Sequence, residues 1–190
     1  MQKSFDFYRN KRIAVSGASG FIGSCLLNEL SKHSKKAFGL SRKKVKIKKL
    51  KILKIDLNKE KDLKKVVKKF DIFFHFSANT NLLWAQKNPH NNFISNVKPI
   101  INLIRSSIKL KKKIKIIFAS TGTIYGLDKK KIITEKDIPL PITIYDKYKL
   151  LVEKILKANT KFNLIDSVSL RIQSVYGRSL TESKDKTRGI

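Results

Sequence analysis

The sequence predicts one α/β domain: a doubly wound parallel sheet in which six strands are recognisable. Three observations predict it. Short apolar runs alternate with amphipathic segments along most of the chain. A glycine-rich turn at residues 17–23 directly follows the first apolar run. The length of 190 residues, 41% of them apolar, suits one domain with a substantial core rather than two.

The expected strands are short apolar runs bounded by polar or glycine-containing segments. In chain order they cover residues 12–16, 37–41, 51–56, 71–76, 114–120 and 164–171. Strands joined by helices run parallel, and parallel sheets are buried on both sides. We therefore expect helices on both faces of this sheet.

The expected helices carry apolar residues at three- and four-residue spacing. They cover residues 20–33 and 59–69, a longer segment within 89–109, and part of 142–159. The connection from Ser41 to Lys51 is too short for a good helix, so we expect a loop or short crossover there. Residues 1–178 should form the domain, and the polar, basic residues 179–190 are either a disordered tail or the start of a further region.

The charge balance is strongly basic, with a net charge of +29. Only seven of the 43 basic residues are arginine, the residue best suited to bidentate recognition of phosphate, and no aromatic residues interleave with the densest lysine runs, 43–54 and 111–113. A nucleic-acid partner is therefore disfavoured. The single cysteine, Cys25, excludes an internal disulfide and a cysteine-based metal cluster, and no metal is expected. Without a long apolar run or a signal-type start, the expectation is a cytoplasmic protein that binds no membrane.

The glycine turn has the spacing G-x-x-G-x-x-G, with a strand before it and an amphipathic helix after it. Gly17 permits the tight turn, Gly20 lets backbone amides approach a pyrophosphate, and Gly23 lets the helix pack close to the sheet. The helix N-terminus then offers free N–H groups to the anion. The alternative is a glycine-rich turn that binds no ligand. The residues expected to bind a dinucleotide here are Gly17, Ser19, Gly20, Phe21, Ile22 and Gly23.

The ends of the next two strands bear on the choice of cofactor. No acidic residue follows the second strand, whereas Arg42 could pair with a 2′-phosphate, which favours NADP over NAD. Alternatively, Arg42 and Lys43 are two further cations in a lysine-rich loop. Asp56, followed by Leu57, could accept a hydrogen bond from an adenine amino group or cap the following helix.

Two further strand ends reach the edge where open α/β sheets bind ligands. The small residues Ser77 and Ala78 follow the fourth strand and would let a cofactor lie close to the sheet. Thr121 follows the fifth strand, and its hydroxyl could hydrogen-bond a substrate oxygen.

A possible acid/base pair lies in the pattern Tyr145-x-x-x-Lys149. Positions i and i+4 share a helix face, so Lys149 should lie beside the Tyr145 phenol and lower its pKa. Tyr145 would then be a general acid/base near neutral pH. Tyr125 and Lys129 match the same pattern, but Gly126 follows Tyr125 where no helix is expected, so Tyr145 is the better candidate.

Together these segments resemble the extended short-chain dehydrogenase/reductases, the NAD-dependent epimerase/dehydratase group, over roughly residues 11–178. The resemblance rests on seven segments in family order: Gly17-x-x-Gly20-Phe21-Ile22-Gly23, Asp56-Leu57, residues 71–78, Asn96-Val97, residues 120–126, Tyr145-x-x-x-Lys149 with Glu153, and residues 171–177. It implies a Rossmann fold that binds NAD(P), with Phe76 and Asn96 as further cofactor-binding residues. It also implies a triad of Thr121, Tyr145 and Lys149 that moves a proton while a hydride passes between substrate and nicotinamide. Lys149 would also hold the nicotinamide ribose, so Tyr145 and Lys149 count among the cofactor-binding residues.

The resemblance also implies a substrate and a partner. Many members act on nucleotide-linked sugars, and relatives often dimerise through the two helices that follow the fourth and fifth strands. The sequence departs from the family pattern at three places. Gly122-Thr123 disfavours a dehydratase. Ser174 and Arg178 replace the residues that are usual in the sugar-binding loop of the relatives. Because relatives continue well beyond position 190, the substrate-binding portion is expected to be largely absent. A non-catalytic dinucleotide-binding module or inactive remnant is therefore the alternative to an active epimerase or oxidoreductase.

Overall fold

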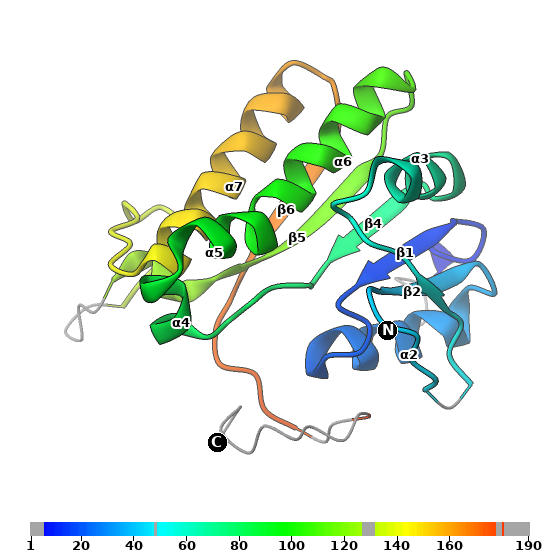
Figure 1. Ribbon diagram of the computed structural model, residues 1–190, viewed down its shortest axis with the longest axis horizontal. Coiled ribbons are helices and arrows are strands. Elements are labelled where there is room, and N and C mark those ends of the chain that lie inside the picture. Colours follow the sequence, from blue (N-terminus) through cyan, green and yellow to red (C-terminus); the bar gives the residue numbers. More distant parts are fainter. Residues whose placement is uncertain (1–5, 48, 127–131, 178–179, 181–190) are drawn as a thin grey trace.

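The computed structural model describes residues 6–47, 49–126, 132–177 and 180. Its centre is one six-stranded sheet with the order β3-β2-β1-β4-β5-β6, in which all neighbouring strands run parallel (Figure 1). The strands are β1 (Ile13–Ser16), β2 (Ala37–Ser41), β3 (Ile52–Lys54), β4 (Ile72–His75), β5 (Lys115–Thr121) and β6 (Asp166–Ile172). This confirms the predicted doubly wound parallel sheet and its six strands.

Helices lie on both faces of the sheet (Figure 1). Helix α2 (Phe21–His33) packs on one face against β1 and β2. Helices α3 (Glu60–Lys69), α6 (Lys98–Lys109) and α7 (Ile144–Lys161) cover the other face. At β6, the sheet face that carries α2 is less well covered by helices. Val168 and Leu170, both in β6, are 44% and 40% exposed.

The segment expected to hold one long helix holds two, and a third precedes them. These are α4 (Leu82–Lys87), α5 (Pro89–Asn96) and α6. Pro89 and Pro99 each lie in the first turn of a helix, where a missing N–H leaves no hydrogen bond unmade. Helix α4 begins where the Asn81 side chain accepts a hydrogen bond from the Trp84 amide at 2.9 Å. The start at Pro89 agrees with the expected segment, whereas Pro99 lies in the first turn of a new helix where one continuous helix was expected, and α4 was not expected.

The connection between β2 and β3 agrees with the prediction, the segment after β5 does not, and most of the C-terminal region lies outside the described residues. Residues 42–51, apart from residue 48, contain neither helix nor strand, as their short length predicted. A 3₁₀ helix, η1 (Gly122–Tyr125), follows β5, where no helix was expected. Of the predicted region 179–190, only residue 180 is described, and Arg178 and Lys129 also lie outside the described residues. Within the described ranges, no helix is long and apolar enough to cross a membrane.

The core has one apolar cluster on each side of the sheet. The larger, between the sheet and α3, α6 and α7, includes Phe73, Phe118 and Leu103. The smaller lies under α2 and includes Val15, Leu27 and Phe74. Because neighbouring residues of β1 and β4 contribute to opposite clusters, these strands are buried on both sides.

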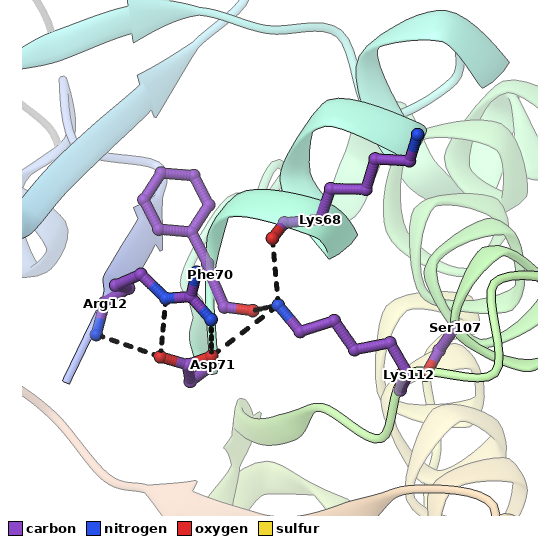
Figure 2. A network of polar contacts seen from close by, with 6 residues as sticks. All are labelled: Arg12, Lys68, Phe70, Asp71, Ser107 and Lys112. Carbon is purple, nitrogen blue, oxygen red and sulfur yellow. Dashed lines mark hydrogen bonds and ion pairs between the residues drawn. The ribbon is translucent and has the colours of Figure 1, made fainter.

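A network of polar contacts links residues at the end of the sheet where the strands begin (Figure 2). The Arg12 guanidinium donates two hydrogen bonds to the Asp71 carboxylate, at 2.9 and 2.5 Å, and the Lys112 ammonium lies 3.6 Å from the same carboxylate. Lys112 also donates to the carbonyl oxygens of Lys68 and Phe70. The Arg12 hydrogen bonds lower the pKa of Asp71 to about 2. The network joins the starts of β1, β4 and β5 at the edge opposite the predicted site.

Candidate functional site

The predicted cofactor residues lie where the strand order changes direction. The chain passes from β1 to β2 and β3 on one side, then returns to place β4 on the other side of β1. In open α/β sheets, ligands bind at the carboxyl ends of the strands beside this switch point. The turn that follows β1 lies at this point.

Two glycines of this turn are required by close packing. Gly17 has a φ of 70°, and a Cβ there would lie 2.7 Å from the Phe76 carbonyl and the Ser77 nitrogen. A Cβ on Gly23 would lie 2.3 Å from the Gly17 oxygen. Gly20 is less confined, since its Cβ would meet the Gly17 oxygen only at 3.3 Å. Gly17 and Gly23 therefore fix the turn against β4 and α2, while Gly20 lines its open side.

A hydroxyl between β1 and β4 also fixes this turn. The Ser16 Oγ accepts hydrogen bonds from the backbone amides of Phe76 and Ser77 and lies 2.9 Å from the His75 Nδ1. Burial lowers the pKa of His75 to about 3, so its ring is neutral at physiological pH. Ser16 thus orders the segment that leaves β4 and enters the cleft.

A cleft of about 1190 Å³ opens at this edge of the sheet. Twelve of the predicted cofactor-binding residues line it. They are Gly17, Ser19, Gly20, Phe21, Ile22, Gly23, Arg42, Asp56, Leu57, Phe76, Ser77 and Ala78. The structure therefore brings together residues from the ends of β1, β2, β3 and β4 that are up to 61 positions apart in the sequence.

The start of α2 suits an anion. Gly20 caps the helix without a side-chain hydrogen bond, and the first turn has no acidic residue. Its first residues, Phe21, Ile22 and Gly23, line the cleft. Because the first amides of a helix have no partner within the helix, they are available to a phosphate there. These residues fit the pyrophosphate of a dinucleotide.

Asp56 and Asn96 differ in their roles. The Asp56 carboxylate accepts from the Asn58 amide at 3.0 Å and lines the cleft, but the helix N-cap is Lys59, so the helix-cap alternative for Asp56 is wrong. Asn96 is buried outside the cleft lining, and its carboxamide bonds both backbone groups of Asn79, at 2.8 and 3.0 Å. Asn96 therefore holds Asn79 at the cleft wall rather than facing the cleft itself.

The predicted catalytic residues meet at the end of β5. Tyr145 and Lys149 are buried on one face of α7 at 9% and 4% exposure, and the Lys149 Nζ lies 5.6 Å from the Tyr145 ring centroid. The ammonium donates to the Ala119 carbonyl of β5 at 2.6 Å, and burial lowers the pKa of Lys149 to about 8.

The expected lowering of the Tyr145 pKa is wrong for this arrangement. Burial and the neighbouring Asp146 carboxylate raise the pKa of Tyr145 to about 12, because both disfavour a phenolate. Lys149 directs its charge to the Ala119 carbonyl instead of the phenol oxygen. Tyr145 is therefore held as a protonated phenol.

Thr121 is linked to α7 through a chain of hydrogen bonds. Its Oγ1 lies 2.8 Å from the Thr123 Oγ1, which donates to the Asp146 carboxylate at 2.5 Å. The same carboxylate accepts from the backbone and hydroxyl of Thr143, the N-cap of α7, in a capping box. This series of hydrogen bonds fixes the end of β5 against α7, the helix that carries Tyr145.

Tyr125, the other tyrosine that matches the sequence pattern, contacts β6 instead. Arg171 of β6 donates a hydrogen bond to the Tyr125 hydroxyl and bonds both carboxylate oxygens of Glu153. Its guanidinium also stacks 4.9 Å from the Tyr125 ring centroid. Tyr125 therefore joins η1 to β6. Among the described residues, no group of three or more metal-ligating side chains occurs.

Comparison with known families agrees with this geometry. A profile of the family described as "NAD dependent epimerase/dehydratase family" matches residues 13–190. The chain belongs to this family. Epimerase/dehydratase membership accounts for the glycine turn and the parallel sheet together.

Individual relatives are sugar-nucleotide epimerases. UDP-glucose 4-epimerase of Mycoplasma genitalium is 32% identical over 89% of this chain and 54% of its own length, and that of Lactobacillus helveticus is 30% identical over 88% and 53%. Among solved structures, UDP-N-acetylglucosamine 4-epimerase from Methanobrevibacter ruminantium superposes with a TM-score of 0.82 at 25% identity, covering 96% of this chain and 60% of that one. UDP-glucose 4-epimerase of Thermus thermophilus, a complex with NAD, gives 0.76 at 26% identity over 87% and 56%. The chain thus spans about half the length of the curated relatives it matches.

The comparisons bear on the expected cofactor of this epimerase/dehydratase family member. The family description and the Thermus thermophilus complex both specify NAD. The predicted preference for NADP has no support from them. Arg42 is exposed at the cleft, as a side chain in a lysine-rich loop also would be.

Several cleft residues were missed by reasoning from the sequence. Asn58, Asn79, Thr80, Gln173 and Val175 line the cleft. The first three belong to loops that follow β3 and β4, where position after a strand was the available signal. Gln173 and Val175 lie just past β6, a segment known only as part of a family motif.

Proposed function

We propose that this chain is the cofactor-binding and catalytic part of an NAD-dependent epimerase or oxidoreductase that acts on a nucleotide sugar. One observation carries the proposal: the cleft beside the glycine turn and the Tyr145–Lys149 pair lie at the same edge of one sheet. The sugar-nucleotide epimerases among the relatives suggest the substrate class.

When bound, NAD would supply a carbon that accepts or returns a hydride. The glycine turn and the start of α2 would hold the pyrophosphate, and Ser77 and Ala78 would let the cofactor approach the sheet. Asp56 and Leu57 would lie on the adenine side. Each of these residues lines the cleft.

Tyr145 would exchange the proton of a sugar hydroxyl. With its pKa at about 12, the phenol suits proton donation to a sugar keto oxygen, which is the reductive direction. Removal of a proton requires positive charge near the phenol oxygen, and Lys149 is the buried cation within reach of that ring. Thr121, ordered through Thr123, would hydrogen-bond the same sugar oxygen.

A second candidate is a dinucleotide-binding module without catalysis. One observation favours it: the Lys149 ammonium is bonded to the Ala119 carbonyl rather than to Tyr145. Such a module would bind NAD through the same cleft and leave a nucleotide sugar unchanged.

Conversion of UDP-glucose and UDP-N-acetylglucosamine, followed with NAD present, separates the candidates. The catalytic proposal predicts conversion of at least one sugar, with loss of turnover and near-normal NAD binding in Tyr145→Phe. Unchanged turnover in Tyr145→Phe would refute the assigned mechanism. NAD binding with no conversion of either sugar would favour the module.

The predicted homodimer has a candidate surface on α6 and α7. Ile101, Ile108 and Leu151 are exposed on these helices, and Ile104 and Ile155 line a groove between them. We propose that a second copy covers this face. Sedimentation should show a dimer that Ile108→Glu converts to a monomer, whereas a monomeric wild-type chain would refute the proposal.

A further inference from the structure

Gln173 has an unusual place in the cleft. It directly follows β6, and together with Val175 it lines the cleft from the C-terminal side of the fold. Every other lining residue lies between positions 16 and 99. Gln173 therefore reaches the cleft from the end of the sheet that lies farthest from β3.

The side chain of Gln173 lies against a glycine. A Cβ at Gly122 would lie 2.0 Å from the Gln173 Nε2, 2.2 Å from its Cδ and 2.5 Å from its Oε1. Gly122 is not among the glycines with a positive φ, so its backbone does not itself require glycine. The missing side chain at Gly122 instead leaves the space that the Gln173 carboxamide fills, one residue after Thr121.

The carboxamide has hydrogen-bonding capacity left over. It can donate two hydrogen bonds and accept through its oxygen, yet no residue within the described ranges bonds to it. Because Gln173 is exposed and lines the cleft, its carboxamide is open to water and to a molecule bound there. A ligand group that both donates and accepts would match it best.

The position of Gln173 selects which part of a dinucleotide it would face. The two halves of the cofactor lie on either side of the switch point, with the pyrophosphate at the glycine turn between them. Arg42, Asp56 and Leu57, at the ends of β2 and β3, occupy the adenine side. The ends of β4, β5 and β6 are left for the nicotinamide side, where Gln173 lies.

We infer that the Gln173 carboxamide binds the carboxamide of the nicotinamide ring. The absence of a side chain at Gly122 provides the space that this position of Gln173 requires. This inference rests on the proposed binding of NAD in this cleft. Two primary amides can pair through one donor and one acceptor each, which would fix the rotation of the nicotinamide ring beside Thr121. Gln173 is thus a positioning residue that selects for the nicotinamide end of the cofactor.

Comparison of NAD with ADP-ribose tests the inference, because ADP-ribose lacks the nicotinamide. In Gln173→Met, which keeps the length of the side chain and removes its amide, the Kd for NAD should rise about tenfold, as expected for two neutral hydrogen bonds. The Kd for ADP-ribose should not change. Equal changes for both ligands, or no change for either, would overturn the inference.

Gly122→Ala provides an independent test, since its new Cβ would displace the flexible end of Gln173. It should weaken NAD binding as much as Gln173→Met does, and it should add nothing in a Gln173→Ala background, where space is available. Additive effects of the two substitutions would overturn the inference. If the wild-type chain bound neither NAD nor ADP-ribose, the proposed function itself would fail, whereas binding of ADP-ribose as tightly as NAD would refute only the role of Gln173.

Discussion

The Asp146 carboxylate should be a principal link between the sheet and α7. It is 4% exposed and accepts three hydrogen bonds, from the Thr123 hydroxyl, the Thr143 hydroxyl and the Thr143 amide. Asp146→Ala removes a helix cap and a charge-assisted bond, which together should lower the free energy of unfolding by about 2–3 kcal/mol. For a chain of this size, that corresponds to a fall of roughly 6–10 °C in Tm.

A double-mutant cycle with Thr123→Val isolates the bond that reaches β5. Chemical denaturation of the four proteins should give a coupling free energy of about 1 kcal/mol between positions 123 and 146. Asp71→Asn, at the opposite edge of the sheet, is the control partner and should be additive with Thr123→Val within about 0.5 kcal/mol. If the Thr123 and Asp146 substitutions were also additive, the inferred link from Thr121 to α7 would be refuted.

Two further predictions concern the sheet edge and the glycine turn. The pKa of Asp71 is about 2 in the fold and 3.8 ordinarily, so its ion pairs stabilise the fold above about pH 4, and that contribution disappears as pH falls through 2. Asp71→Asn should therefore lower the free energy of unfolding by about 1 kcal/mol at pH 7, after allowance for solvent screening. Its difference from wild type should shrink below pH 4. As a control, Asp166→Asn, at a more exposed carboxylate, should change the free energy of unfolding by less than about 0.5 kcal/mol. A constant difference down to pH 2 would contradict the assignment. Gly23→Ala should destabilise by about 1–3 kcal/mol because its Cβ meets the Gly17 oxygen at 2.3 Å, whereas Gly20→Ala should fold normally and bind NAD more weakly; equal melting temperatures for both variants would contradict this packing argument.

The sequence predicted the parts of the fold that depend on local patterns. Apolar runs located all six strands, and the glycine spacing located the turn at the switch point. Helix α4 was not predicted, and the break between α5 and α6 was missed because apolar residues continue across it, whereas Pro99 acts through backbone hydrogen bonding.

The site was less predictable where tertiary contacts decide a side chain's role. The spacing of Tyr145 and Lys149 correctly indicated a shared helix face, but the raised pKa of Tyr145 depends on burial and on Asp146. Asn96 appeared as a motif residue, yet its carboxamide bonds Asn79 and not the cleft. The pairing of Gln173 with Gly122 joins positions 51 residues apart through the order of the strands, which local spacing does not reveal.

Binding of NAD to the purified 190-residue chain tests the central claim most directly. The Tm should be measured with NAD, with NADP and without either, since a ligand that binds the folded state raises Tm by mass action. The cleft geometry predicts a clear rise with NAD that is smaller in Gly20→Ala, and a larger rise with NADP would restore the role expected of Arg42. No rise with either dinucleotide would contradict the account of this cleft as a cofactor site.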